Sequence, residues 1–221
     1  FSLITEREAD PNIFDPFDAP EDGEARDAFR EHFDSSIPSP DQEKKVFHLS
    51  GSEISTGRYR VLTGELSVTE TLDRAKQHSL SLTEYLVGIY FHSLQKIQEK
   101  ENFGKRRGKW KPLSVMVPVN LRGLLKSTTM RNFFLTLNPL LDTRLDHYDL
   151  REIFTEVRTF MRTALDHRHL KQQIARNVRG RIHPLLRVAP LRVKDLALKL
   201  IYLDYGESRF SGSLSNIGKI D

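Results

Sequence analysis

Two apolar stretches in the middle of the chain carry the strongest strand signals. Residues 113–119, LSVMVPV, are almost continuously apolar, which predicts a strand buried on both faces. Pro118 has no N–H to donate to a neighbouring strand, so it should lie at the end of this strand or at an edge. Residues 134–141, FLTLNPLL, predict a second strand, and alternating residues at 45–51 and 58–66 predict two shorter ones.

Apolar residues spaced by three and four predict helices at 68–78, 82–100 and 149–167. Each is preceded by two residues able to cap it: Ser67 or Thr69, Ser81 or Thr83, and Asp146 or Asp149. In the second helix the predicted buried stripe consists of Leu82, Leu86, Ile89, Tyr90, Leu94 and Ile97.

The third helix is the most regular, and its period extends to about Asn177, before Gly180 and Pro184. A further amphipathic helix is expected from Val193, Leu196, Ala197, Leu200 and Ile201. Strands alternating with helices predict an α/β fold, in which a mixed β-sheet carries helices packed on it.

Residues 1–45 form an acidic arm with many Asp and Pro residues and one short helix in EARDAFREHF. Residues 1–43 hold thirteen Asp or Glu and three Arg, so this segment has a charge near −10 and the remainder one near +14. The division indicates either an anionic partner for the basic body or an arm that lies against it.

Two segments concentrate basic residues. Residues 101–112 surround Trp110 with five Lys or Arg, and residues 168–194 contain eight and no acid. Basic residues beside an aromatic side chain are typical of nucleic-acid binding, but a short exposed turn and a solvated helical face are the favoured interpretations. We therefore do not expect a nucleic-acid partner.

The chain has no cysteine, which excludes disulfides and thiolate chemistry. No apolar run approaches the roughly 18 residues of a membrane-spanning helix, and the acidic start is unlike a signal peptide, so a cytoplasmic protein is expected. His92 is expected to be half-buried, and a helix would place His167 and His169 on different faces, so no metal site is predicted.

Polar residues follow the 113–119 strand, at the end where open sheets commonly bind ligands. Asn120, Arg122 and Asn132 are the candidates there, although the residues alone favour a structural interpretation in which Asn120 caps a turn and Arg122 pairs with a surface acid. The last element, 209–220, is rich in small residues and lets a ligand or backbone approach closely. Ser213, Ser215 and Asn216 would line such an approach.

The segments PVNLR, TMRNFF and LSNIG, in this order, resemble the chloramphenicol acetyltransferase-like or condensation-domain superfamily, in particular its alcohol acetyltransferase branch. DAPEDGEARDAFREHF and KKVFHLSG are similar to the segment that follows the catalytic motif in such proteins. The resemblance covers almost the whole chain.

This resemblance implies one lobe of a two-lobed α/β acyltransferase with a tunnel between the lobes. In such enzymes a histidine of an HHxxxDG motif takes the proton of an alcohol or amine that attacks an acyl thioester. Coenzyme A or a carrier arm would bring the acyl group as co-substrate, and no tightly bound cofactor is implied. Asn120, Arg122 and Asn132 would lie near the lobe interface, and Ser213, Ser215 and Asn216 along the tunnel, where a hydroxyl could donate to the oxyanion.

The sequence contains no HHxxxDG motif, so the general base is missing from this chain. We therefore expect residues 46–221 to be an incomplete lobe, inactive alone, whose partners are an N-terminal lobe of the same protein, an acyl donor and a small-molecule acceptor. An exposed apolar face or edge should remain where that lobe docks, or where a second copy pairs. The alternative is a non-catalytic interaction or scaffold domain with the same fold.

Overall fold

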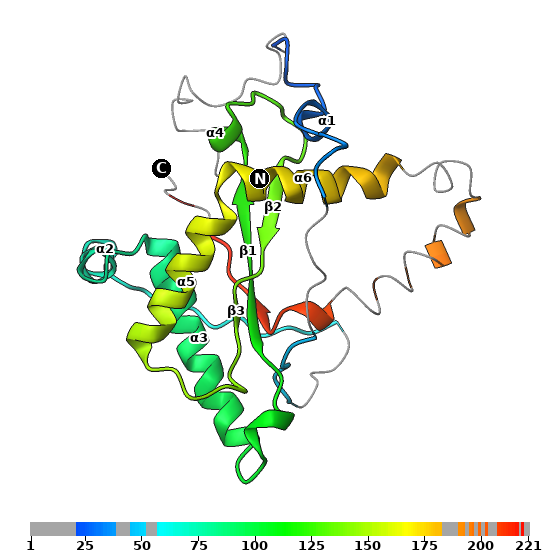
Figure 1. Cartoon of the computed structure of the whole chain (residues 1–221). Coiled ribbons are helices and arrows are strands. Elements are labelled where there is room, and N and C mark those ends of the chain that lie inside the picture. The colour runs from blue at the N-terminus through cyan, green and yellow to red at the C-terminus, as the bar shows by residue number, and fades with distance from the viewer. Residues whose placement is uncertain are drawn as a thin grey trace.

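The computed structural model describes residues 21–38, 45–51 and 57–182, together with 190–192, 195, 196, 199, 202, 207–216 and 218. Figure 1 shows the arrangement of its helices and strands. In chain order these are α1 (Ala28–Glu31), α2 (Val68–Gln77), α3 (Leu82–Glu101), the 3₁₀ turn η1 (Arg107–Lys109), β1 (Leu113–Asn120), α4 (Arg122–Leu125), β2 (Phe134–Leu137), β3 (Leu140–Leu141), α5 (Leu150–Ala164), α6 (His167–Ile182), the 3₁₀ turn η2 (Glu207–Arg209) and β4 (Gly212–Ser213).

β1 is the strand with which every other described strand pairs. β2 and β3 are both antiparallel to it, with Val117 opposite Leu137 and Leu113 opposite Leu141. The two pairings keep one register, so β2 and β3 continue each other along the same edge of β1, as the single predicted strand at 134–141 requires. β4 pairs with β1 in parallel, which makes the sheet mixed, as the sequence predicts.

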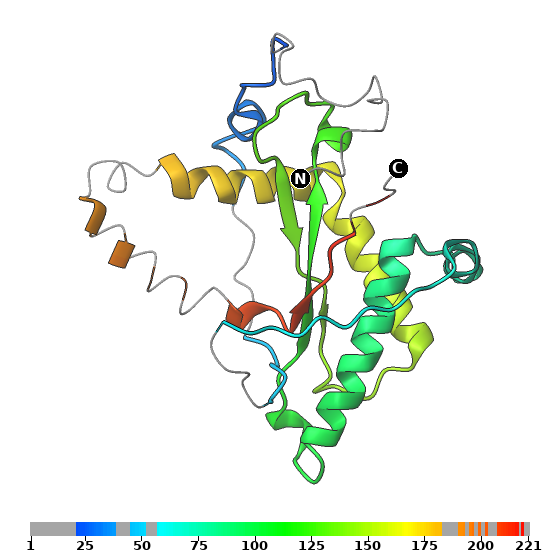
Figure 2. The ribbon, with the colours of Figure 1, turned by 180° about the vertical axis from the view of Figure 1, so that it is seen from behind.

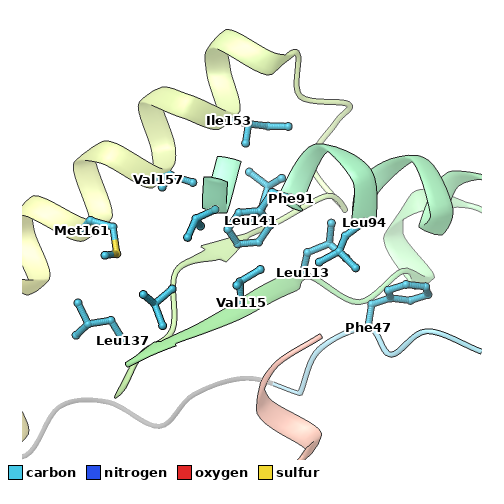
Figure 3. Packing of buried hydrophobic residues seen from close by; sticks show 12 residues of the cluster. Phe47, Phe91, Leu94, Leu113, Val115, Leu137, Leu141, Ile153, Val157 and Met161 are labelled. Atoms are coloured by element: carbon cyan, nitrogen blue, oxygen red, sulfur yellow. The ribbon is translucent and has the colours of Figure 1, made fainter. Parts of the chain in front are cut away.

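The main core lies between β1 and the helices α3 and α5 (Figure 3). Leu113, Val115 and Val117 alternate along β1 and point to the same side, because successive side chains of a strand face opposite sides. They meet Phe91 and Leu94 of α3, and α5 adds Ile153, Val157 and Met161 to the same cluster. This core confirms that the helices predicted at 82–100 and 149–167 pack on the sheet, whereas Ala75 of α2 packs against Phe154 of α5 in a separate cluster.

A second core attaches the described part of the acidic arm to the body. Phe29 of α1 is buried against Phe133, with ring centroids 5.0 Å apart, and α6 contributes Leu170, Ile174 and Val178 to this cluster. Arg179 of α6 also donates to the carbonyl oxygens of Ser35 and Ile37. Of the two interpretations of the arm, its residues 21–38 follow the one in which it lies against its own body.

The strands predicted at 45–51 and 58–66 are wrong. Val46 and Phe47 donate single backbone hydrogen bonds, to Ser208 and to Pro112, and these two bonds do not form a ladder. In the described residues 57–66 the apolar side chains are exposed instead of buried, Tyr59 by 86% and Leu62 by 83%. Alternation alone therefore gave a wrong prediction, because none of the described strands pairs with these residues.

The stripe predicted on α3 is also partly wrong. Leu94 is buried, but Ile89 and Ile97 are 36% and 40% exposed. The buried face instead contains Gln95 and Gln98, which bind backbone groups of the segments that follow the helix. Hydrophobic periodicity could not identify these two amides as buried, since it treats every glutamine as a surface residue.

The helix predicted at 149–167 is confirmed within a few residues, but its period, which extends to about Asn177, does not belong to one continuous helix. α5 ends at Ala164 and α6 begins at His167, and α6 crosses over β1 and β2 (Figure 1). Asp166 lies in the break, where its carboxylate accepts from the N–H of Arg168 and its carbonyl from that of Leu170. α6 then continues past Gly180 and ends two residues before Pro184.

Some expectations concern residues outside the described part of the chain, among them Val193, Ala197, Leu200 and Ile201 of the last predicted helix. Among the described residues, no helix combines the length and apolar character needed to cross a bilayer.

The described residues likewise contain no group of three or more His, Cys, Asp or Glu able to hold a metal ion. His92 is half-buried, as expected, and this burial lowers the pKa of its imidazole from the ordinary 6.5.

Candidate functional site on the open face of the sheet

The two faces of the sheet differ in what covers them. α5 and α6 lie on the side seen in Figure 1. In Figure 2 the opposite side of β1 and β2 faces the viewer, and no described helix crosses it. We call this side the open face and define it by Met116, Pro118, Asn120, Phe134, Thr136 and Ser213, none of which is buried.

The strand registers place these residues on one face. Asn120 lies opposite Phe134, and Pro118 lies opposite Thr136. Directly paired residues point to the same side of a sheet, so the polar end of β1 and the start of β2 share a surface.

β4 brings the small-residue segment to the same surface. Ser213 pairs with Met116, two residues before Pro118, and its side chain therefore points to the open face. Gly212 pairs with Val115 and points the other way, toward α3, where a Cβ would lie 2.0 Å from the hydroxyl oxygen of Tyr90. The glycine thus lets β4 lie beside β1, and Ser213 is exposed next to it.

The two remaining candidates in this segment are exposed. The hydrogen bond from the Leu214 N–H to the Met116 carbonyl continues the contact with β1 as far as Leu214, the residue before Ser215. The side-chain amide of Asn216 donates to the Thr83 hydroxyl at 3.0 Å, at the start of α3, and its Oδ1 accepts from the Gly218 N–H. Asn216 therefore anchors the end of this segment on α3, and Ser213 and Ser215 keep their hydroxyls at the surface.

Arg122 holds the loop that joins β1 to β2. Its Nε donates to the Thr129 carbonyl at 2.6 Å, and its Nη2 donates to the Arg131 carbonyl at 2.8 Å. Asn120 closes the turn before it, since its Oδ1 accepts from the Arg122 N–H at 3.0 Å. The expectation that Asn120 caps a turn is confirmed, whereas Arg122 binds carbonyl oxygens in place of a surface acid.

The arm supports this loop from outside the sheet. The Thr129 hydroxyl donates to the Arg26 carbonyl at 2.7 Å, and the Met130 N–H donates to the Glu24 carbonyl at 2.8 Å. Thr129 is buried as a result. No pattern in the sequence predicts this contact, because the two segments are about a hundred residues apart.

Asn132 lies in a different environment from the other candidates. It lines a cavity of about 300 Å³ together with Phe29, Phe134, Thr136 and Asn177. This cavity joins α1, the edge of β2 and α6, so it borders the open face at Phe134 and Thr136. The structure therefore brings Asn120 and Ser213 onto one face, while Asn132 lies at its β2 margin and Asn216 at its α3 margin.

No family model, curated protein or solved structure matches this chain. The functional argument consequently depends on the geometry of the open face and on the motifs in the sequence. Chemically, this face offers neutral hydroxyl and amide groups beside an exposed aromatic ring. Such groups donate and accept hydrogen bonds, and they suit the binding of an uncharged polar ligand.

Proposed function

We propose that this chain forms one wall of an acyl-transfer site, in which an acyl group moves from a coenzyme A or carrier thioester to an alcohol or amine. The wall is the open face of the sheet. The general base, a histidine of an HHxxxDG motif, would come from a complementary lobe that docks on this face.

The observation that carries this proposal is the parallel pairing of β4 with β1. It puts Ser213, the residue before the LSNIG segment, on the same face as Asn120 of PVNLR, although the two residues are more than ninety positions apart. The resemblance requires PVNLR and LSNIG to border a common tunnel, and their shared surface supports that requirement.

In this proposal the residues of the chain bind and orient, and the proton moves elsewhere. The base removes the hydroxyl or amine proton and the freed lone pair attacks the thioester carbonyl. The C–S bond then breaks, and the protonated base returns its proton to the leaving thiolate, which departs as the thiol. Ser213 or Ser215 donates to the carbonyl oxygen as it becomes negative. Arg122 acts as a positioning residue, since its guanidinium already binds the carbonyl oxygens of Thr129 and Arg131.

The test uses the full-length protein and measures thiol release from acetyl coenzyme A with a series of alcohols and amines. The expected result is acceptor-dependent release that is lost when the first motif histidine is replaced by alanine. Ser213→Ala should lower kcat by about 10²-fold if this hydroxyl is the oxyanion donor. Ser93→Ala is the control, because Ser93 is exposed on α3 and bonds only the Ile89 carbonyl. A full-length gene without the HHxxxDG motif would refute the enzymatic proposal.

The second candidate is a non-catalytic interaction domain. Exposed apolar side chains at Tyr59, Val61, Leu62, Leu66 and Val68 favour it, because contiguous apolar surface of this kind commonly contacts another protein. The same full-length protein separates the two candidates: binding of a partner without thioester turnover would support the interaction domain.

A further inference from the structure

A polar cavity lies between the end of α2 and the outer side of α5, and it shares no residue with the open face. Its volume is about 310 Å³, and it is lined by Gln77, His78, Ser79, Arg151, Phe154, Thr155 and Arg158. The lining includes two arginines and no carboxylate.

The two arginines lie on one face of α5. Arg151, Thr155 and Arg158 are separated by four and three residues, which is the spacing of neighbours along a helix surface. Arg158 is half-buried, and neither guanidinium has a hydrogen bond or ion pair among the described residues. The two guanidinium groups carry like charges and repel each other, and an anion bound between them would offset this repulsion.

No carboxylate lines the cavity, and three carboxylates of the adjoining helices α2, α3 and α5 bind other groups. Glu152 accepts from the Asp149 N–H as part of the cap of α5, and Asp73 pairs with Lys76 at 3.7 Å. Glu84 accepts from the Ser81 N–H and lies 3.8 Å from Arg162. The cavity therefore keeps an excess of positive charge.

The end of α2 forms the opposite wall. The Ser79 N–H donates to the Lys76 carbonyl and the Leu80 N–H donates to the Ala75 carbonyl, which is the Schellman arrangement at a helix end. Ser79 has φ of 57°, a left-handed conformation that glycine usually adopts at this position. A serine in this conformation is strained relative to glycine, and it adds a hydroxyl group to the lining of the cavity.

The carbonyl end of α2 carries partial negative charge, which would disfavour an anion. Arg162 counteracts it, because its Nη2 donates to the Ser79 carbonyl at 3.1 Å. Arg151 and Arg158 therefore remain available for a ligand.

We propose that this cavity binds the phosphate group of a small molecule. Guanidinium groups pair with phosphate oxygens through two parallel N–H donors, and two arginines with the Ser79 hydroxyl match a tetrahedral oxyanion. The Thr155 hydroxyl lines the cavity but donates to the Arg151 carbonyl at 3.0 Å. The volume exceeds that of a phosphate ion, so there is room for a small organic part beside His78. This site is independent of the acyl-transfer proposal.

The experiment is calorimetric titration of inorganic phosphate into the whole chain, with sodium chloride at matched ionic strength as reference. Saturable binding is expected, and both Arg158→Gln and Arg151→Gln should weaken it about tenfold or more. Tighter binding of phenyl phosphate than of inorganic phosphate would identify a phosphate ester as the ligand, and equal binding would identify the free ion.

Arg168→Gln is the matched control, because Arg168 is exposed on α6 and its removal changes the net charge equally. Thermal unfolding of each variant checks that it is folded. The proposal is overturned if phosphate binds no better than chloride, or if Arg168→Gln weakens binding as much as Arg158→Gln does.

Discussion

Single residues decide how closely the elements of this protein approach each other. Gly88 of α3 is buried against Phe154 of α5, and a Cβ at this position would lie 2.3 Å from the Phe154 Cδ1 atom. Gln98 is fully buried in the same helix, where its amide donates to the Lys111 carbonyl at 2.7 Å and its Oε1 accepts from the Thr143 hydroxyl. The close contact at Gly88 and the buried hydrogen bonds of Gln98 thus determine which face of α3 packs against the core.

The first stability prediction concerns Gly88. Gly88→Ala should destabilise the protein by about 1–3 kcal/mol, because overpacking outweighs the helix propensity gained by alanine. Chemical denaturation measures the change. Gly123→Ala is the control, since no atom lies within 4 Å of the Cβ position of Gly123 in α4. Equal stability of the Gly88 variant and the wild type would mean that α3 and α5 are not in close contact.

Gln98 also shows where sequence reasoning stopped. The spacing of apolar residues identified α3 and the core residue Leu94, but a glutamine is buried only if its partners are present. Its partners are the Lys111 carbonyl, just before β1, and the Thr143 hydroxyl, just after β3. The sequence around Gln98 does not indicate that these groups will lie beside it. Ile89 and Ile97 were consequently placed inside when they are partly exposed.

At the scale of elements, helix starts are encoded locally. Ser81 and Asp149 both form complete capping boxes, in which each side chain accepts from the third helical N–H and a glutamate returns the bond. The sequence offers two possible caps at each start, and the observed cap is the one with a glutamate three positions later. Helix ends were less predictable, since the break at Asp166 depends on the packing of α6 across the sheet.

Asp149→Ala should therefore lower the free energy of unfolding by about 1 kcal/mol, the usual effect of losing an N-cap. Asp146→Ala is the matched control and should have a smaller effect, because Asp146 accepts only from the adjacent His147 N–H. Denaturant titration of both variants distinguishes them. A larger loss for the Asp146 variant would place the start of α5 earlier in the chain.

At the scale of the whole molecule, the arm is part of the folded body over residues 21–38. Opposite charge suggested this contact, but the contact itself is mostly apolar and backbone-mediated. Phe29 is buried beside Phe133, and the carbonyls of Glu24 and Arg26 accept from Thr129. Composition predicted that the arm has a partner, and it could not specify which surface that partner is.

Phe29→Ala should release this part of the arm, because removing a buried aromatic ring costs about 3–5 kcal/mol. Limited proteolysis should then cleave within residues 21–38 much faster than in the wild type. Phe103→Ala, which alters a ring that is 91% exposed, should leave the cleavage rate unchanged. Unchanged protection in the Phe29 variant would show that the backbone contacts alone hold the arm.

The position of β4 in the sequence has a consequence for biosynthesis. β1 meets β2 after a short loop, but the hydrogen bond between Ser114 and Ser211 joins residues 97 positions apart. At about 5–20 residues per second, a ribosome needs roughly 5–20 s to deliver the second partner. During that interval one side of β1 has unpaired N–H and C=O groups, which can template pairing with another nascent chain. Newly made copies are therefore most prone to aggregation before residues 211–214 emerge, and co-translational chaperones would act in this interval.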